Sequence, residues 1–206
     1  MMHEKEPDGE GIDSVPKGER RRAFDIRRDA PHLIALGALL EISESDSETV
    51  REHIADLERL PDGVVQALVR AQVRVRIGDR LVRDFPEAAG LNLQRASNIA
   101  IYSRRYRIAM IGRGATASQS PALHEVGHAL GDIEGWNGDT GARAAWEATL
   151  GEIEDEHYEN LTDPEKAIRE TIAETFADLI MNGNLARERW GDLLIDRMVA
   201  LIASLA

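Results

Sequence analysis

Cysteine is absent from the 206-residue chain. Without thiols the protein can form no disulfide framework, bind no metal ion through a thiolate and use no cysteine nucleophile. An excess of basic residues is absent too, because 37 acidic residues against 25 basic ones give a net charge of −12 at pH 7. This balance argues against nucleic-acid phosphate as the main partner.

Long apolar segments are also missing. The longest, Leu33 to Leu40, is far too short to span a bilayer, and residues 1–29 are charged and hold no apolar core of a Sec signal peptide. We therefore expect a soluble protein with no membrane partner, either cytoplasmic or exported by a non-Sec route. Its oligomeric state stays open.

The remaining composition, 43% hydrophobic, suffices for one buried core. Residues 1–30 are rich in charged residues, Gly and Pro, and we expect them to form a flexible tail. We expect residues 31–206 to be a single domain, with helices and a sheet up to about residue 114 and a helical part over 115–206. Apolar periodicity and turn residues predict strands at 73–77, 99–102 and 106–111, and helices at 31–40, 47–60, 64–69, 121–130, 142–153, 164–182 and 191–205.

The most informative segment is His124-Glu125-Val126-Gly127-His128. Positions four apart lie on the same face of a helix, so both imidazoles can converge on one ion while Glu125 lies beside it. Two zinc-binding histidines, with a glutamate that takes a proton from the metal-bound water, form the metallopeptidase motif. The sequence therefore predicts a Zn²⁺ site with His124 and His128 as ligands and Glu125 as general base.

The residues around this motif are typical of a helix. Ser120 is a suitable N-cap, Pro121 suits the first helical position, and Gly131 is expected to end the helix.

A catalytic zinc usually has three protein ligands and an open position for water. The predicted helix over 164–182 carries Glu170, Glu174 and Asp178, which are four residues apart and therefore share one face. We favour Glu174 as the third ligand, with Asp178 accepting the free N–H of His124 or His128. In the alternative register Glu170 is the ligand and Glu174 is the hydrogen-bond partner.

This order of segments resembles a known group. A strand and a Gly-rich turn lead to His124–His128, and a long insertion leads to Glu174-Thr175-Phe176-Ala177-Asp178, as in the catalytic domain of anthrax lethal factor and the Pro-Pro endopeptidases. The resemblance implies a zincin-like α+β domain, in which a small mixed sheet packs on the active-site helix and further helices follow. It also implies a zinc endopeptidase of protein or peptide substrates, acting as a toxin-like effector or a regulatory protease.

One position departs from this group, whose members place a tyrosine seven residues before the third ligand to stabilise the tetrahedral intermediate. Counted from Glu174, that position is Ala167. Either Tyr158 or His157 takes over this catalytic role, or activity is weak or lost. The last outcome would make the protein a zinc-bound binding module.

The helix also resembles that of the ImmA/IrrE group of regulator-cleaving peptidases, because Glu170-Thr171-Ile172-Ala173-Glu174-Thr175-Phe176-Ala177 fits their Glu-x-x-Ala-x-x-Phe-Ala pattern. That reading makes Glu170 the ligand. The family resemblance further implies a peptide bound in extended form along an edge strand, expected at Tyr106 to Ile111 or just after it. An acidic protein is expected to prefer basic peptides.

Overall fold

The computed structural model describes residues 31–43, 47–79, 84–85, 100–112, 118–150, 153 and 163–206. The predicted N-terminal tail, as well as Tyr158 and His157, lies outside these residues. In the part of the chain that the structure describes, no helix combines the length and the apolar character needed to cross a membrane.

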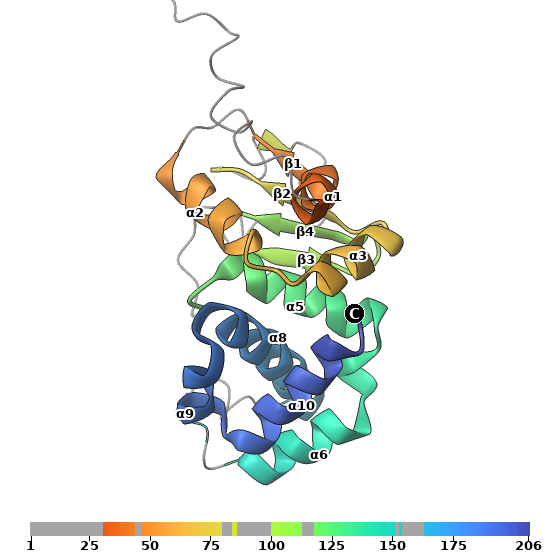
Figure 1. The fold of residues 1–206 in the computed structure, drawn as a ribbon, viewed down its shortest axis with the longest axis vertical. Coiled ribbons are helices and arrows are strands. Elements are labelled where there is room, and N and C mark those ends of the chain that lie inside the picture. Colours follow the sequence, from red (N-terminus) through yellow and green to blue (C-terminus); the bar gives the residue numbers. More distant parts are fainter. Residues whose placement is uncertain are drawn as a thin grey trace, which may run out of the picture.

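A four-stranded mixed sheet with the order β1-β2-β4-β3 forms one half of the molecule (Figure 1). Strands β1 (Leu40–Ile42), β2 (Arg74–Ile77) and β4 (Ile108–Ile111) run parallel to one another, and β3 (Ile101–Ser103) pairs antiparallel with β4. The sequence predicted the last three strands. It missed β1, because three residues are too short to reveal an alternating pattern.

Among the described strands, β3 forms the edge of the sheet near the motif. Residues 108–111 of β4 pair on one side with β2 and on the other with β3. The expectation that residues 106–111 offer an edge to a peptide is therefore wrong for this strand.

Of the helices that the structure describes, three lie in the sheet half and a fourth connects the two halves of the molecule. Helices α1 (Pro31–Leu39), α2 (Glu48–Leu57) and α3 (Asp62–Arg70) lie in the sheet half, whereas α5 (Pro121–Ile133) lies between the sheet and the C-terminal helices (Figure 1). The position of α5 matters because this helix carries the motif histidines.

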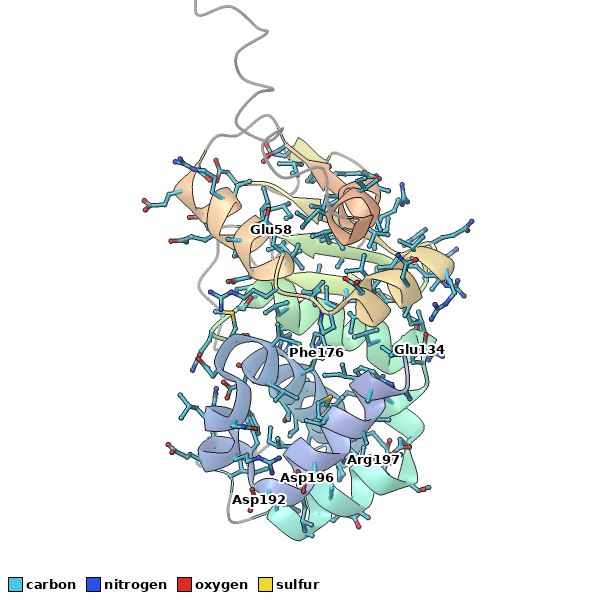
Figure 2. The ribbon with its side chains drawn as sticks, viewed as in Figure 1. Glu58, Glu134, Phe176, Asp192, Asp196 and Arg197 are labelled. Atoms are coloured by element: carbon cyan, nitrogen blue, oxygen red, sulfur yellow. The ribbon has the colours of Figure 1, made fainter. Side chains whose placement is uncertain are left out.

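The C-terminal half is helical. Its described elements are, in chain order, η4 (Trp136–Gly138), α6 (Thr140–Thr149), α8 (Pro164–Asn182), η5 (Gly183–Leu185), α9 (Ala186–Trp190) and α10 (Asp192–Ala203). Helix α8 packs against α5 and is buried over most of its length. Its Phe176 is fully buried and contacts the ring of Trp136, with the two centroids 6.1 Å apart (Figure 2).

Two glycines of α5 explain how closely its neighbours approach. A Cβ atom on Gly127 would lie 2.7 Å from Cα and 2.8 Å from the carbonyl oxygen of Ala173, so the backbones of α5 and α8 are in contact there. Gly131 does not end the helix as expected, since α5 continues to Ile133. A Cβ on Gly131 would lie 2.6 Å from Oδ1 of Asn137, which makes this glycine a packing residue.

Candidate metal centre

The start of α5 is fixed by its cap. The Oγ atom of Ser120 accepts the backbone N–H of Leu123 at 3.3 Å and donates to Oδ2 of Asp56 at 2.7 Å, and Pro121 occupies the first helical position. The predicted cap is confirmed. Because Asp56 belongs to α2, this contact also ties the motif helix to the sheet half.

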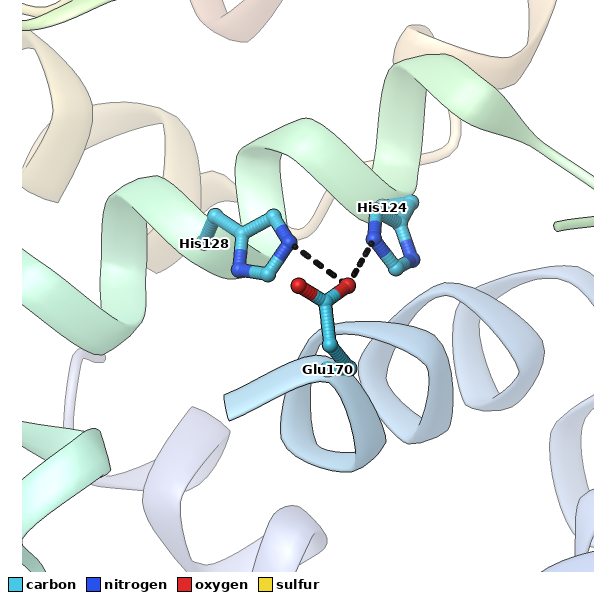
Figure 3. A group of neighbouring side chains, drawn as sticks. All are labelled: His124, His128 and Glu170. Atoms are coloured by element: carbon cyan, nitrogen blue, oxygen red, sulfur yellow. Dashed lines mark ion pairs between the residues drawn. The ribbon is translucent and has the colours of Figure 1, made fainter. Parts of the chain in front are cut away.

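Three side chains converge between α5 and α8. One oxygen of Glu170, Oε2, lies 3.3 Å from Nε2 of His124 and 3.3 Å from Nε2 of His128 (Figure 3). The two imidazole rings are nearly perpendicular, and the ligand atoms of all three residues lie within 4.8 Å of one another. The group as a whole is only partly buried, so it is open to solvent on one side.

Glu174 does not lie at this position. Its Oε2 is 2.8 Å from Nδ1 of His124, on the edge of the ring that faces away from Glu170. The structure therefore differs from the favoured register and corresponds to the alternative, in which Glu170 meets the histidines and Glu174 supports one of them. The two glutamates are one helical turn apart on the same helix face, so helical periodicity alone could not tell which of them contacts the histidines.

Asp178 does not make its expected contact with a histidine either. Instead of a histidine, its carboxylate accepts hydrogen bonds from Nε1 of Trp190 at 2.7 Å and from Nδ2 of Asn182 at 2.5 Å. The Arg189 guanidinium lies 3.5 Å from Asp178 and 3.7 Å from Oε1 of Glu174. The sequence did not predict these contacts of Arg189 and Trp190, because both residues lie on α9 and no motif near them indicates a role at the site.

Carboxylates on both sides control the charge of His124. Its burial alone would lower the pKa, but the hydrogen bonds to Glu170 and Glu174 raise the pKa to about 9. In turn, burial would raise the pKa of Glu170, whereas the hydrogen bonds from His124 and His128 hold this pKa well below its usual range. A positively charged ion is thus favoured between these groups, whether it is a proton or a metal.

Glu125 is shielded from water and has no cation at ion-pair distance among the described residues, although the backbone of Tyr102 forms a hydrogen bond with it. It is 5% exposed, and its Oε2 has no hydrogen-bond partner among the described residues. Burial raises its pKa, while the charges of His128 and His124 act in the opposite direction. A buried carboxylate with a raised pKa beside a cleft is typical of a general base.

The converging atoms are spaced like ligands of one metal ion. Ligands that lie about 2.0–2.1 Å from a tetrahedral zinc are about 3.3–3.4 Å from one another. Both nitrogen-to-oxygen distances at Glu170 are 3.3 Å. The contact of Nδ1 of His124 with Glu174 also leaves Nε2 free to bind a metal, as carboxylate–histidine–zinc contacts do. His124, His128 and Glu170 can therefore hold a metal ion.

The group opens into a cleft of about 810 Å³. One wall consists of β3 with Ile101 and Tyr102, and another consists of the first turns of α8. The hydroxyl of Tyr102 donates to Oδ2 of Asp132 at 3.2 Å. Ala167, at the position that carries tyrosine in the resembling group when counted from Glu174, is buried and does not line this cleft.

Among the comparisons with known proteins, the one with solved structures bears on the fold. No family model matches the sequence, and no curated protein matches it. A solved structure that is similar to this chain is the Pro-Pro endopeptidase of Paenibacillus alvei, with a TM-score of 0.61 at 15% identity. The match covers 81% of this chain and 99% of the other. The expected α+β class, with a small mixed sheet and further C-terminal helices, is confirmed, and the chain has a fold similar to that of a Pro-Pro endopeptidase.

Proposed function

We propose that this protein is a zinc-dependent endopeptidase of the zincin type. The observation that carries the proposal is the convergence of Glu170 with His124 and His128 at 3.3 Å, beside a buried Glu125. Glu170 replaces Glu174 as the third ligand in this proposal. The fold similarity to a Pro-Pro endopeptidase supports peptide-bond hydrolysis as the class of reaction.

Zinc bound there would lower the pKa of a water molecule to about 7 and polarise the scissile carbonyl. The Glu125 carboxylate would accept a proton from the attacking water and donate it to the leaving amine, a role for which its raised pKa suits it. Glu174 accepts the Nδ1 proton of His124 and thereby fixes the tautomer that binds metal. Arg189 lies behind Glu174 and offsets its charge.

The free edge of β3 is the natural place for the substrate. Strand β3 pairs only with β4 in the described sheet, and Ile101 and Tyr102 line the cleft next to the histidines. An extended peptide that pairs with this edge would bring its backbone carbonyls past Glu125. The edge strand thus shifts from the expected 106–111 segment to β3.

The test is the zinc content of purified wild type, Glu170→Gln and Glu174→Gln, together with the cleavage of a diverse peptide library. We expect one zinc and cleavage in wild type, and loss of both in Glu170→Gln. Glu174→Gln should keep the site but bind zinc about 10–100-fold more weakly. A wild-type protein that takes up no zinc after supplementation would overturn the proposal, and loss of zinc in Glu174→Gln alone would restore the other register.

A zinc-bound binding module is the second candidate. It is favoured by the missing tyrosine, because the position seven residues before Glu170 is Asp163, whose carboxylate caps α8. Tyr158 and His157 remain proposed replacements. Zinc at full stoichiometry without cleavage of any library peptide would favour the binding module.

A further inference from the structure

The first turns of α8 bring two cations into the cleft. Lys166 and Arg169 both line it, together with Glu170, and both are exposed. Lys166 is four residues before Glu170 and so lies on the same helix face, with about 5–6 Å between the Cβ atoms. Arg169 directly precedes Glu170. Both long side chains therefore start within reach of the space beside the three converging ligands.

Apart from the buried Glu125, the other charged residues that line the cleft already have partners of opposite charge. Arg104 pairs with Asp132 at 2.5 Å, and both oxygens of Glu165 accept from Arg143 at 2.9 Å. Glu170 is held by the two histidines. Among the residues that the structure describes, neither the Lys166 ammonium nor the Arg169 guanidinium has a carboxylate at ion-pair distance.

Two neighbouring basic residues without a carboxylate at ion-pair distance are unexpected in a chain that carries 37 acidic residues against 25 basic ones. A protein with such an excess of acids repels anionic ligands from most of its surface. In the described part of the cleft, Lys166 and Arg169 are two cations without an acidic partner, and the planar guanidinium fork of Arg169 matches a carboxylate in particular. Charge complementarity of this kind selects the ligand.

We infer that Lys166 and Arg169 bind a carboxylate of the substrate, close to the scissile bond. The inference rests on the proposed peptidase function and specifies its substrate class as acidic peptides. The carboxylate is either an acidic side chain or the free C-terminus of the peptide. This preference is opposite to the basic peptides expected from net charge alone, because Lys166 and Arg169 lie in the cleft itself, whereas solvent screening weakens the effect of charges elsewhere on the surface.

The experiment compares three pools of randomised peptides of equal length. The first carries Asp or Glu at one position and has a C-terminal amide, the second carries Asn or Gln there, and the third is the second pool with a free C-terminal carboxylate. Cleavage is followed by mass spectrometry with wild type, Lys166→Gln, Arg169→Gln and the double variant. Arg59→Gln removes an equal charge from an exposed residue beyond α2 and is the matched control.

We expect wild type to cleave the acidic-residue pool or the free-carboxylate pool faster than the neutral pool, which identifies the source of the carboxylate. Each single variant should lose up to about fivefold of that advantage. Arg59→Gln should lose none. Equal cleavage of all three pools by wild type would overturn the inference while leaving the peptidase intact. An equal loss on every pool in Lys166→Gln would also overturn it, because Lys166 would then act on the transition state.

A binding measurement keeps the inference testable if no pool is cleaved, which would be a failure of the proposed function. The pools are passed over immobilised Glu125→Gln protein, with and without the Lys166→Gln and Arg169→Gln substitutions, and retained peptides are quantified. Retention of a carboxylate-bearing pool that depends on both cations would support the inference. Equal retention of all pools would overturn it.

Discussion

The His124 imidazole lies between two carboxylates, and each contacts a different nitrogen. Glu174 accepts from Nδ1 at 2.8 Å, and Glu170 lies 3.3 Å from Nε2. Since the partner of one nitrogen decides the protonation of the other, Glu174 acts through His124, whereas Glu170 faces the position proposed for the metal. The two glutamates are therefore expected to affect the protein differently, although they look equivalent in the sequence.

Glu125→Gln tests the general base. The amide keeps the size of the side chain but cannot take a proton, so cleavage should fall by at least about 10²–10⁴-fold. Zinc content should stay at one per chain, because Glu125 is not among the three converging ligands. Library cleavage and elemental analysis on the same sample check both. Full activity in this variant, or loss of its zinc, would contradict the role proposed for Glu125.

At the scale of elements, the contact between α5 and α8 positions the centre. Gly127 lies between the two motif histidines, and the backbone of Ala173 touches it from a helix that carries Glu170 three residues earlier. This contact fixes how far α8 is shifted along α5. A displacement by one turn would exchange Glu170 for Glu174 at the histidines.

Gly127→Ala should disturb both stability and metal binding. The new methyl group would lie 2.7 Å from Cα of Ala173, a backbone atom that cannot rotate away, so the two helices must separate. We expect a loss of about 1–3 kcal/mol in the free energy of unfolding and weaker zinc binding. Urea denaturation and zinc titration measure the two effects.

Gly37→Ala is the control for that variant. Gly37 lies inside α1, and a Cβ atom there would meet nothing within 4 Å. The substitution should stabilise the protein by about 0.5–1 kcal/mol through helix propensity and leave zinc affinity unchanged. Equal behaviour of the two alanine variants would contradict the importance of the α5–α8 contact.

Asp139 links α6 to α10, and this contact allows a second, independent prediction. Its Oδ1 accepts the backbone N–H of Ala142 at 2.6 Å and the Nε–H of Arg197 at 2.9 Å; Figure 2 labels Arg197 on α10. The hydrogen bonds from Arg197 lower the pKa of Asp139 below its ordinary 3.8, although burial acts against this. The interaction of Asp139 with Arg197 therefore stabilises the folded state above about pH 4, and this stabilisation is lost as the pH falls through the lowered pKa of Asp139.

Asp139→Ala should reduce the free energy of unfolding by about 1 kcal/mol at pH 7, chiefly through loss of the helix cap. The gap between variant and wild type should narrow below pH 4, as measured by urea denaturation at several pH values. Asp139→Asn keeps a capping oxygen and should lose less at pH 7. A gap that widens in acid would contradict the assigned role of the carboxylate.

For the molecule as a whole, the proposed metal site lies where the sheet half and the helical half meet. The histidines are on α5, which is tied to α2 through Ser120 and Asp56, and Glu170 is on α8 in the helical half (Figure 1). A metal held by both helices stabilises the folded state, since the unfolded chain does not bring these ligands together.

Metal removal should therefore lower the melting temperature. Zinc at about 100 times its dissociation constant adds about 2.7 kcal/mol, which for a chain of this size corresponds to roughly 5–10 °C. Thermal denaturation with zinc and with a chelator measures the difference. Glu170→Gln should remove it, whereas Arg59→Gln should keep it. A melting temperature that does not respond to zinc in wild type would count against a metal site between the halves.

The sequence determined the features that depend on spacing along one helix. The convergence of His124 with His128 and the cap at Ser120 follow from local geometry, and both are found. Both need only residues that are close in the chain. The class of fold came from the resemblance to the lethal-factor and Pro-Pro endopeptidase domains, which rested on the order of strands and helices and on the two helix motifs.

Tertiary structure alone decided what lies opposite the motif. Helical periodicity places Glu170, Glu174 and Asp178 on one face but does not say which of them is level with the histidines. The contact between Gly127 and Ala173, which are 46 positions apart in the chain, determines which carboxylate faces the histidines. Pairing between distant segments likewise places β3 at the edge of the sheet. Spacing along the chain determines which side chains share a helix face. The packing of α8 on α5 determines which of those side chains lies level with the histidines.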